Sequence, residues 1–282
     1  MKVRIGTLED FRKRTARQRQ SSLDRAIVDH ARATIAAVRR RGDEAVLREV
    51  RRFDRRETRA AELWVDASVL RAAADRCPAP LRRAVDHAYA SIAEFHRRQR
   101  PRPITWTGRG FRTSLVPEPL ARIGGCVPRG AVAYPSTVLM IGVPARIAGV
   151  RELVLASPLP RDGALDPVLA YAAVKVGAVG LYRAGGAVAV AALAHGTASL
   201  ARVDKIVGPG NAHTAAAKWL VSADVGIDSL AGPSELVVVA SGDGDPAAIA
   251  LDLAAQAEHG AGATAAAPPA RYRPTAPTFT AA

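Results

Sequence analysis

Residues 151–195 read RELVLASPLPRDGALDPVLAYAAVKVGAVGLYRAGGAVAVAALAH and contain the same rhythm twice. Each short apolar run, RELVLAS at 151–157 and VGLYRAG at 179–185, is followed by a helical stretch, at 166–178 and at 187–197. Strands buried on both faces of a parallel sheet have this near-continuous apolar character, and helices connect them. The stretch therefore predicts an α/β fold built from Rossmann-like parallel βαβ units.

The same rhythm continues on both sides of this stretch. PSTVLMIGVPARIAGV at 135–150 predicts a helix, VDKIVGPG at 203–210 a strand, and NAHTAAAKWLVSA at 211–223 a further helix. We therefore expect one α/β region over residues 111–259. Ligands of such sheets bind at the carboxyl ends of the strands, where the glycine-rich joints of this chain fall.

Residues 1–110 predict an N-terminal helical region. The segment at 21–43 places Ile27, Ala31, Ile35 and Val38 on one helical face, with Ser22 suited to the N-cap. DEAVLREVRRFD at 43–54 continues the helical period, and PAPLRRAVDHAYASIAEFHRRQR at 78–100 predicts another long helix after a proline pair.

Composition limits the class of protein. The 282 residues include only two cysteines, Cys77 and Cys126, which are far apart and form no CxxC motif, so we expect a reducing, cytoplasmic setting. The N-terminus lacks a signal peptide's apolar core, and no apolar run is long enough to cross a membrane. The protein is thus predicted to be soluble.

The net charge of +14 makes nucleic acid a candidate partner, because basic residues bind phosphate groups. The basic residues are mostly arginines on the amphipathic helices of the first hundred positions, without a zinc-finger, aromatic RNA-binding or helix-turn-helix pattern. We interpret them as a solvated surface and expect no nucleic-acid partner, with a non-catalytic binding remnant as the alternative.

Two glycine-rich turns are candidate binding sites. Gly208, Pro209 and Gly210 allow close backbone approach, and Asn211 follows at a helix start, where it either binds a polar ligand or simply caps the helix. The paired Gly185 and Gly186 form another strand-to-helix turn, but the chain contains no GxGxxG dinucleotide fingerprint with its acidic partner.

Three residues near the C-terminus are further candidates. Ser234 begins a β-prone run and either contacts a substrate or serves as a turn residue, since no GxSxG elbow surrounds it. Gln256 and His259 are three residues apart, a helical spacing that presents two ligands to one metal. The alternative for His259 is a helix-terminal histidine that suits the dipole.

In order along the chain, these segments resemble the histidinol dehydrogenase family. The matching stretches are VPRGAVAYPSTVLMIGVPARIAGV, AGGAVAVAALAHGT, VDKIVGPGN, VGIDSLAGPSELVVVA and DLAAQAEHG, and the resemblance extends from about residue 25 to His259. It implies a zinc-dependent enzyme that oxidises L-histidinol to L-histidine through L-histidinal with two molecules of NAD. It also implies a cytoplasmic homodimer with Rossmann-like domains.

The resemblance further implies roles for individual residues. Asn211 matches a contact to NAD, Ser234 a contact to the substrate, and Gln256 and His259 match zinc ligands that adjoin the substrate. Two NAD-contact positions depart from the family: Val188 stands where the family has glutamine, and Cys126 where it has tyrosine. A paralogous dehydrogenase acting on another small polar alcohol is the alternative that these departures favour.

The sequence after Gly260 departs most strongly from the family pattern. The family continues with a catalytic Glu-His pair and with an Asp and a His that complete the zinc site, whereas no acid follows Glu258 and no histidine follows His259 here. Residues 260–282 lack periodicity and predict a disordered tail outside the family pattern. We therefore expect a truncated, frameshifted and inactive member, with no catalytic residue of its own.

Overall fold

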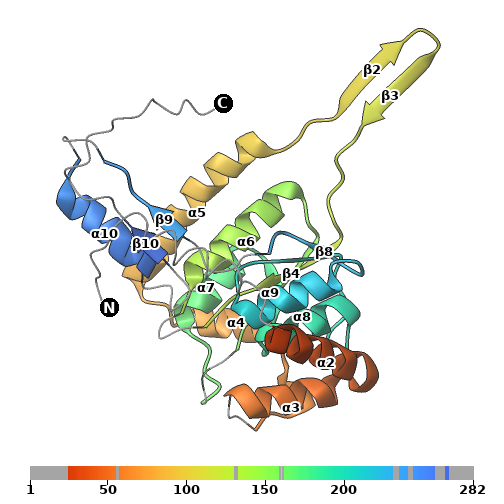
Figure 1. Cartoon of the computed structure of the whole chain (residues 1–282), viewed down its shortest axis with the longest axis vertical. Helices are drawn as coiled ribbons and strands as arrows, with labels where there is room; N and C mark the ends of the chain where they lie inside the picture. The colour runs from red at the N-terminus through yellow and green to blue at the C-terminus, as the bar shows by residue number, and fades with distance from the viewer. Residues whose placement is uncertain are drawn as a thin grey trace. The chain divides into compact units, whose positions relative to one another are not determined.

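The computed structural model describes residues 25–54, 57–129, 133–158, 160, 162–230, 235–240, 244–257 and 264–266 (Figure 1). The chain divides into two compact units. The larger is Arg25–Ala231, and the smaller combines Met1–Asp24 with Gly232–Ala282. The helices before residue 110 belong to the same compact unit as the sheet.

The larger unit is organised around a six-stranded sheet with the order β1-β6-β5-β4-β7-β8. All neighbouring pairs are parallel except β1 with β6. Taken in chain order, the parallel strands run 3-2-1-4-5, which is the Rossmann order, so the topological switch point lies between β4 and β7. The strands are β1 (Trp64–Asp66), β4 (Arg122–Cys126), β5 (Glu152–Ala156), β6 (Ala178–Tyr182), β7 (Lys205–Val207) and β8 (Gly226–Ile227).

Helices cover both faces of this sheet. Two groups pack among themselves, and each group has its own buried apolar cluster. The first group is α2 (Arg25–Arg41), α3 (Asp43–Asp54), α8 (Gly186–His195) and α9 (Ala212–Val221). The second is α4 (Ala67–Ala74), α5 (Ala79–Gln99), α6 (Pro135–Ala148) and α7 (Pro167–Lys175), while η1 (Ala60–Glu62) precedes β1.

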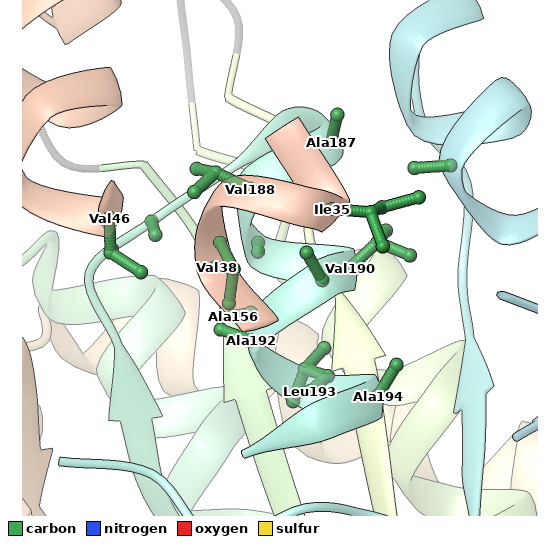
Figure 2. Close-up of a cluster of buried hydrophobic side chains, with 14 of the residues drawn as sticks. Ile35, Val38, Val46, Ala156, Ala187, Val188, Val190, Ala192, Leu193 and Ala194 are labelled. Carbon is green, nitrogen blue, oxygen red and sulfur yellow. The ribbon is translucent and has the colours of Figure 1, made fainter. Parts of the chain in front are cut away.

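Helix α8 is the most deeply buried element. Every position from Ala187 to Ala194 is buried, and Figure 2 shows its side chains against Ile35 and Val38 of α2. A helix that is apolar all round belongs inside a protein, and its alanines let neighbouring backbones approach closely. On the sheet side, Leu193 packs directly over Gly124 of β4. A Cβ on Gly124 would lie only 2.6 Å from Cδ2 of Leu193, so no larger residue fits there.

The predicted elements are largely confirmed. The helices expected around 21–43, 43–54, 78–100, 135–150, 166–178, 187–197 and 211–223, and the strands expected at 151–157, 179–185 and 203–210, all occur. Ala31, Ile35 and Val38 are buried as the pattern requires. Gly42 ends α2 with a positive φ of 53°, whereas Ser22 lies outside the described residues.

Three features differ from the predictions. The N-terminal region is not purely helical, because β1 pairs antiparallel with β6 at the sheet edge. Strand β4 was not predicted, since its RIGGC sequence has the composition of a turn. The hairpin of β2 (Ile104–Gly108) and β3 (Phe111–Leu115) extends away from the layers with nearly every side chain exposed (Figure 1). Such a pair has no buried face whose alternation would reveal it.

The smaller unit is described at β9 (Glu235–Val237), α10 (Pro246–Ala257) and β10 (Thr264–Ala266), with β9 and β10 paired in parallel. Of the tail expected at 260–282, only the three residues of β10 are described. No helix in the described part of the chain is long and apolar enough to cross a lipid bilayer.

The packing of α8 against β4 predicts a large loss of stability for Leu193→Ala. Leu193 is fully buried, and a buried leucine truncated to alanine costs about 2–5 kcal/mol because a cavity remains. Denaturant unfolding followed by circular dichroism measures this loss. Leu115→Ala, at a hairpin position that is 67% exposed, is the control and should unfold like the wild type. Equal midpoints for the two variants would contradict the packing.

Candidate functional site

A pocket of about 180 Å³ lies where β5 and β6 end and where α8 and α9 begin. Three strand-to-helix connections of the sheet and the two N-terminal helices α2 and α3 contribute to its wall. The lining residues are His30, Glu49, Val50, Phe53, Pro158, Gly185, Gly186, Ala187, Val188, Asn211 and His213. This is the carboxyl edge of the parallel strands, where ligands of Rossmann-like sheets bind.

The start of α8 contributes backbone donors to this pocket. Gly185 is the N-cap and has no side chain to satisfy the first N–H groups of the helix. A Cβ on Gly185 would lie 2.7 Å from the ring of Pro158, so the turn packs against the end of β5. Gly186 has a φ of +64° and nothing within 4 Å of its Cβ position, which leaves its backbone open to a ligand.

Asn211 has the helix-capping role that was one of the two expected for it. It is the N-cap of α9, and its Oδ1 accepts hydrogen bonds from the backbone N–H of Thr214 at 3.0 Å and from the Thr214 hydroxyl at 3.2 Å. These bonds fix the side chain, which is exposed and lines the pocket. Because an asparagine carries donors as well as an acceptor, its Nδ2 group remains available to a ligand.

The turn before Asn211 is held by an ion pair whose lysine is buried. Lys218, only 1% exposed, donates to Asp228 and, at 3.1 Å, to the carbonyl of Gly208. Asp228 also accepts from the backbone N–H of Gly208 at 2.7 Å and of Ser229 at 2.6 Å. Burial opposes ionisation of Asp228, but these hydrogen bonds outweigh it and lower its pKa. A Cβ on Gly208, whose φ is +106°, would lie 2.4 Å from the carbonyl oxygen of Cys126.

Cys126 and Val188, the two predicted cofactor contacts that depart from the family, are both buried. Cys126 ends β4 beside the Gly208 turn, and burial raises the pKa of its thiol to about 12, so the thiol stays protonated at neutral pH. Val188 lines the pocket from the first turn of α8. Both cysteines are free, in agreement with the absence of a disulfide framework.

The remaining predicted residues belong to the smaller unit. Gln256 lies in the last turn of α10 and is half-buried. Ser234 and His259 lie outside the described residues. Within the described ranges no group of three or more His, Cys, Asp or Glu side chains is placed to hold a metal ion.

The pocket also contains three ionisable side chains that sequence analysis missed. Glu49 of α3 is buried, and its Oε2 lies 3.6 Å from Nε2 of His30 of α2. The rings of His30 and His213 meet edge to face, with centroids 5.2 Å apart. The position of His213 beside the predicted Asn211 was a local signal, whereas only tertiary packing brings His30 and Glu49 to the same place.

A larger hollow of about 1140 Å³ lies on the α6 side of the same unit. Its wall includes Arg97, Arg100 and Arg102 from the end of α5 and the segment after it, and it reaches Gly208 and Asp228. This hollow is open and collects none of the residues predicted to bind cofactor, so the smaller pocket is the better candidate site.

The ion pair of buried Lys218 with Asp228 generates a stability prediction. Asp228→Asn leaves the buried Lys218 charge without its counterion, which costs about 1–3 kcal/mol in the free energy of unfolding, because solvent reaches Asp228 and screens the pair. Because its folded pKa is lowered, Asp228 stabilises the wild type above its unfolded pKa of about 3.9, and this contribution is lost as the pH falls through the folded pKa.

Urea unfolding between pH 7 and pH 3 tests this prediction. The difference between wild type and Asp228→Asn should be large at neutral pH and should shrink in acid. Asp224→Asn, at an exposed position four residues earlier, is the matched control and should follow the wild type throughout. A difference that does not change with pH would contradict the assigned role of the carboxylate.

Comparison with known proteins shows which family the chain resembles. A sequence model described as histidinol dehydrogenase matches residues 17–267. The chain is 47% identical over 255 residues to the histidinol dehydrogenase of Gluconobacter oxydans, covering 90% of this chain and 59% of that protein. It is 48% identical over 234 residues to the enzyme of Bradyrhizobium diazoefficiens, covering 81% and 53%.

A solved structure agrees with these matches. The crystal structure of histidinol dehydrogenase from Elizabethkingia anophelis superimposes with a TM-score of 0.79 at 32% identity, covering 85% of this chain and 55% of that one. The chain thus spans between half and three-fifths of the length of these relatives. The match covers both the Rossmann-ordered sheet and the turns that form the pocket, and on this evidence the chain belongs to the histidinol dehydrogenase family, whose members are oxidoreductases.

Proposed function

We propose that this chain forms the dinucleotide-binding part of a cytoplasmic, homodimeric histidinol dehydrogenase of histidine biosynthesis. The reaction is the oxidation of L-histidinol to L-histidine through L-histidinal, with NAD as the electron acceptor. The observation that carries the proposal is the pocket at the carboxyl edge of the sheet, where the starts of α8 and α9 meet. The family resemblance implies NAD contacts at these two turns, through Val188 and Asn211, and a third at Cys126.

The residues of the pocket fit a dinucleotide in two respects. The open backbone at Gly186 and the uncapped first turn of α8 suit an anionic group, because a helix N-terminus carries unpaired N–H groups and a partial positive charge. The amide of Asn211, fixed through its Oδ1, supplies a further donor. When bound, NAD takes up the hydride that the substrate releases.

Val188 and Cys126 change how this cofactor is held. A valine side chain offers no hydrogen bond, and a buried thiol that remains protonated is at most a weak donor. Recognition in this chain therefore depends on the backbone of α8 and on Asn211, with Val188 supplying an apolar surface. Both residues line or adjoin the site without binding the polar groups of the cofactor.

The proposed contacts to zinc and to the substrate come from residues of the smaller unit. Gln256 and His259 supply one amide and one imidazole, which are two of the about four groups that zinc ordinarily takes. Ser234 is proposed to contact the substrate. The described residues do not complete a zinc site, so the roles of this chain in the reaction are to bind and orient the dinucleotide and to supply part of the metal and substrate surface.

Asn211→Asp tests the cofactor site. Aspartate keeps an oxygen that caps α9, but it loses the amide donor and adds a negative charge beside the expected phosphate. We expect calorimetric titration to show about tenfold or greater weakening of NAD binding, with an unchanged melting temperature. Asp166→Asn makes the opposite exchange at the N-cap of α7, outside the pocket, and should bind NAD normally. Unchanged binding by Asn211→Asp would contradict the site.

Turnover is expected to be negligible for these 282 residues by themselves. They contain no acid after Glu258 and no histidine after His259, so the Glu-His pair and two zinc ligands that the resemblance implies are not among them. With L-histidinol, NAD and zinc, NADH formation followed by absorbance should match that of Gln256→Ala. A rate clearly above this control would show that the chain supplies its own catalytic groups.

A further inference from the structure

Part of the pocket wall is formed by α2 and α3, and it carries a buried acid. Glu49 is 6% exposed and lines the pocket together with His30 and Phe53. These helices lie far in sequence from the turns at 185–188 and 211–213. The family resemblance assigns no role to it.

Glu49 is buried without a hydrogen bond to any described residue. Its nearest cationic groups are Nε2 of His30 at 3.6 Å and a guanidinium nitrogen of Arg52 at 4.0 Å, both beyond good hydrogen-bond distance. A donor group on a ligand in the pocket can supply the hydrogen bond that these two cations are too far away to make.

The two histidines that line the pocket make aromatic contacts. His30 meets Phe53 edge to face at 5.8 Å and His213 at 5.2 Å. Burial and the neighbouring His30 lower the pKa of His213, so this imidazole is neutral at neutral pH. The Nδ1 atom of His213 is buried and has no hydrogen-bond partner. Within the described part of the chain, the pocket thus contains a carboxylate that accepts no hydrogen bond and an imidazole nitrogen that has no hydrogen-bond partner.

Opposite requirements on the two walls restrict the ligand. The start of α8 attracts an anion, whereas Glu49 repels an anion and requires a donor. A ligand that satisfies both carries a phosphate next to hydroxyl groups, which describes the phosphoribosyl part of a nucleotide. The pocket volume of about 180 Å³ lies below the roughly 300–1,000 Å³ of pockets for whole ligands, so it suits one moiety rather than a complete dinucleotide.

We infer that Glu49, positioned by His30, accepts hydrogen bonds from the adenosine ribose of the dinucleotide and makes this chain select NAD over NADP. The inference rests on the proposed function, because it assigns a contact within the same cofactor site. A carboxylate that receives ribose hydroxyls rejects a 2′-phosphate, since two negative groups would then face each other in a partly dry pocket.

Glu49→Gln tests the assignment in the full chain. The substitution keeps the size of the side chain and removes its charge. We expect calorimetric titration to show about tenfold weaker NAD binding, because hydrogen bonds to an ionised acceptor are roughly twice as strong as neutral ones. NADP should bind at least tenfold more weakly than NAD to the wild type, and the two should bind almost equally to Glu49→Gln.

Glu44→Gln is the matched control. Glu44 lies on the same helix but is exposed and pairs with Arg41 among the described residues, so its loss should leave both affinities unchanged. Binding of AMP should depend on Glu49, whereas binding of nicotinamide mononucleotide should not, because the inferred contact is to the adenosine ribose. The NAD to NADP ratio of the wild type needs no variant, so it tests the inference even if Glu49→Gln fails to fold.

The outcomes separate this inference from the proposed function. NAD binding that Glu49→Gln leaves unchanged, or equal wild-type affinities for NAD and NADP, would overturn the inference while the cofactor site stands. Absence of binding by all four nucleotides would overturn both.

Discussion

Complete burial of α8 is the constraint on which the larger unit depends. Its eight positions from Ala187 to Ala194 are covered by the sheet and by α2, α3 and α9, so each of these elements must fit a helix of small side chains. Gly124 of β4 gives Leu193 its space. This packing also fixes the direction of α8, so that its N-terminus at Gly185 and Gly186 opens into the pocket.

The predictable part of the fold is the part in which burial leaves a local pattern. Alternation of apolar strands with amphipathic or apolar helices predicted the elements from α6 to α9, because each is buried on one or both faces. Strand β4 was not predictable, since Gly124 and Gly125 are required by Leu193 and Ile141 across the layers rather than by the strand itself. Strand β1 has three residues, too few to show a period.

The site residues, too, are predictable only where they leave a local pattern in the sequence. Asn211 and the paired Gly185 and Gly186 were predictable because turns and caps are local chemistry, and the structure brings them to one pocket. Glu49 and His30 carry no local signal, since each occupies an ordinary position on an amphipathic helix. Their proximity to the turns arises only when α2 and α3 pack over α8, which no short pattern encodes.

Glu49 and Val188 bear on one question, which is how the proposed dinucleotide pocket selects its ligand when Val188 and Cys126 stand at two of its expected polar contacts. An apolar Val188 and a protonated Cys126 leave the backbone of α8 to attract phosphate, and backbone N–H groups bind any phosphate equally well. Discrimination must therefore come from a group that distinguishes a hydroxyl from a phosphate. A buried carboxylate without donors has this property, and Glu49 is the carboxylate that lines this pocket.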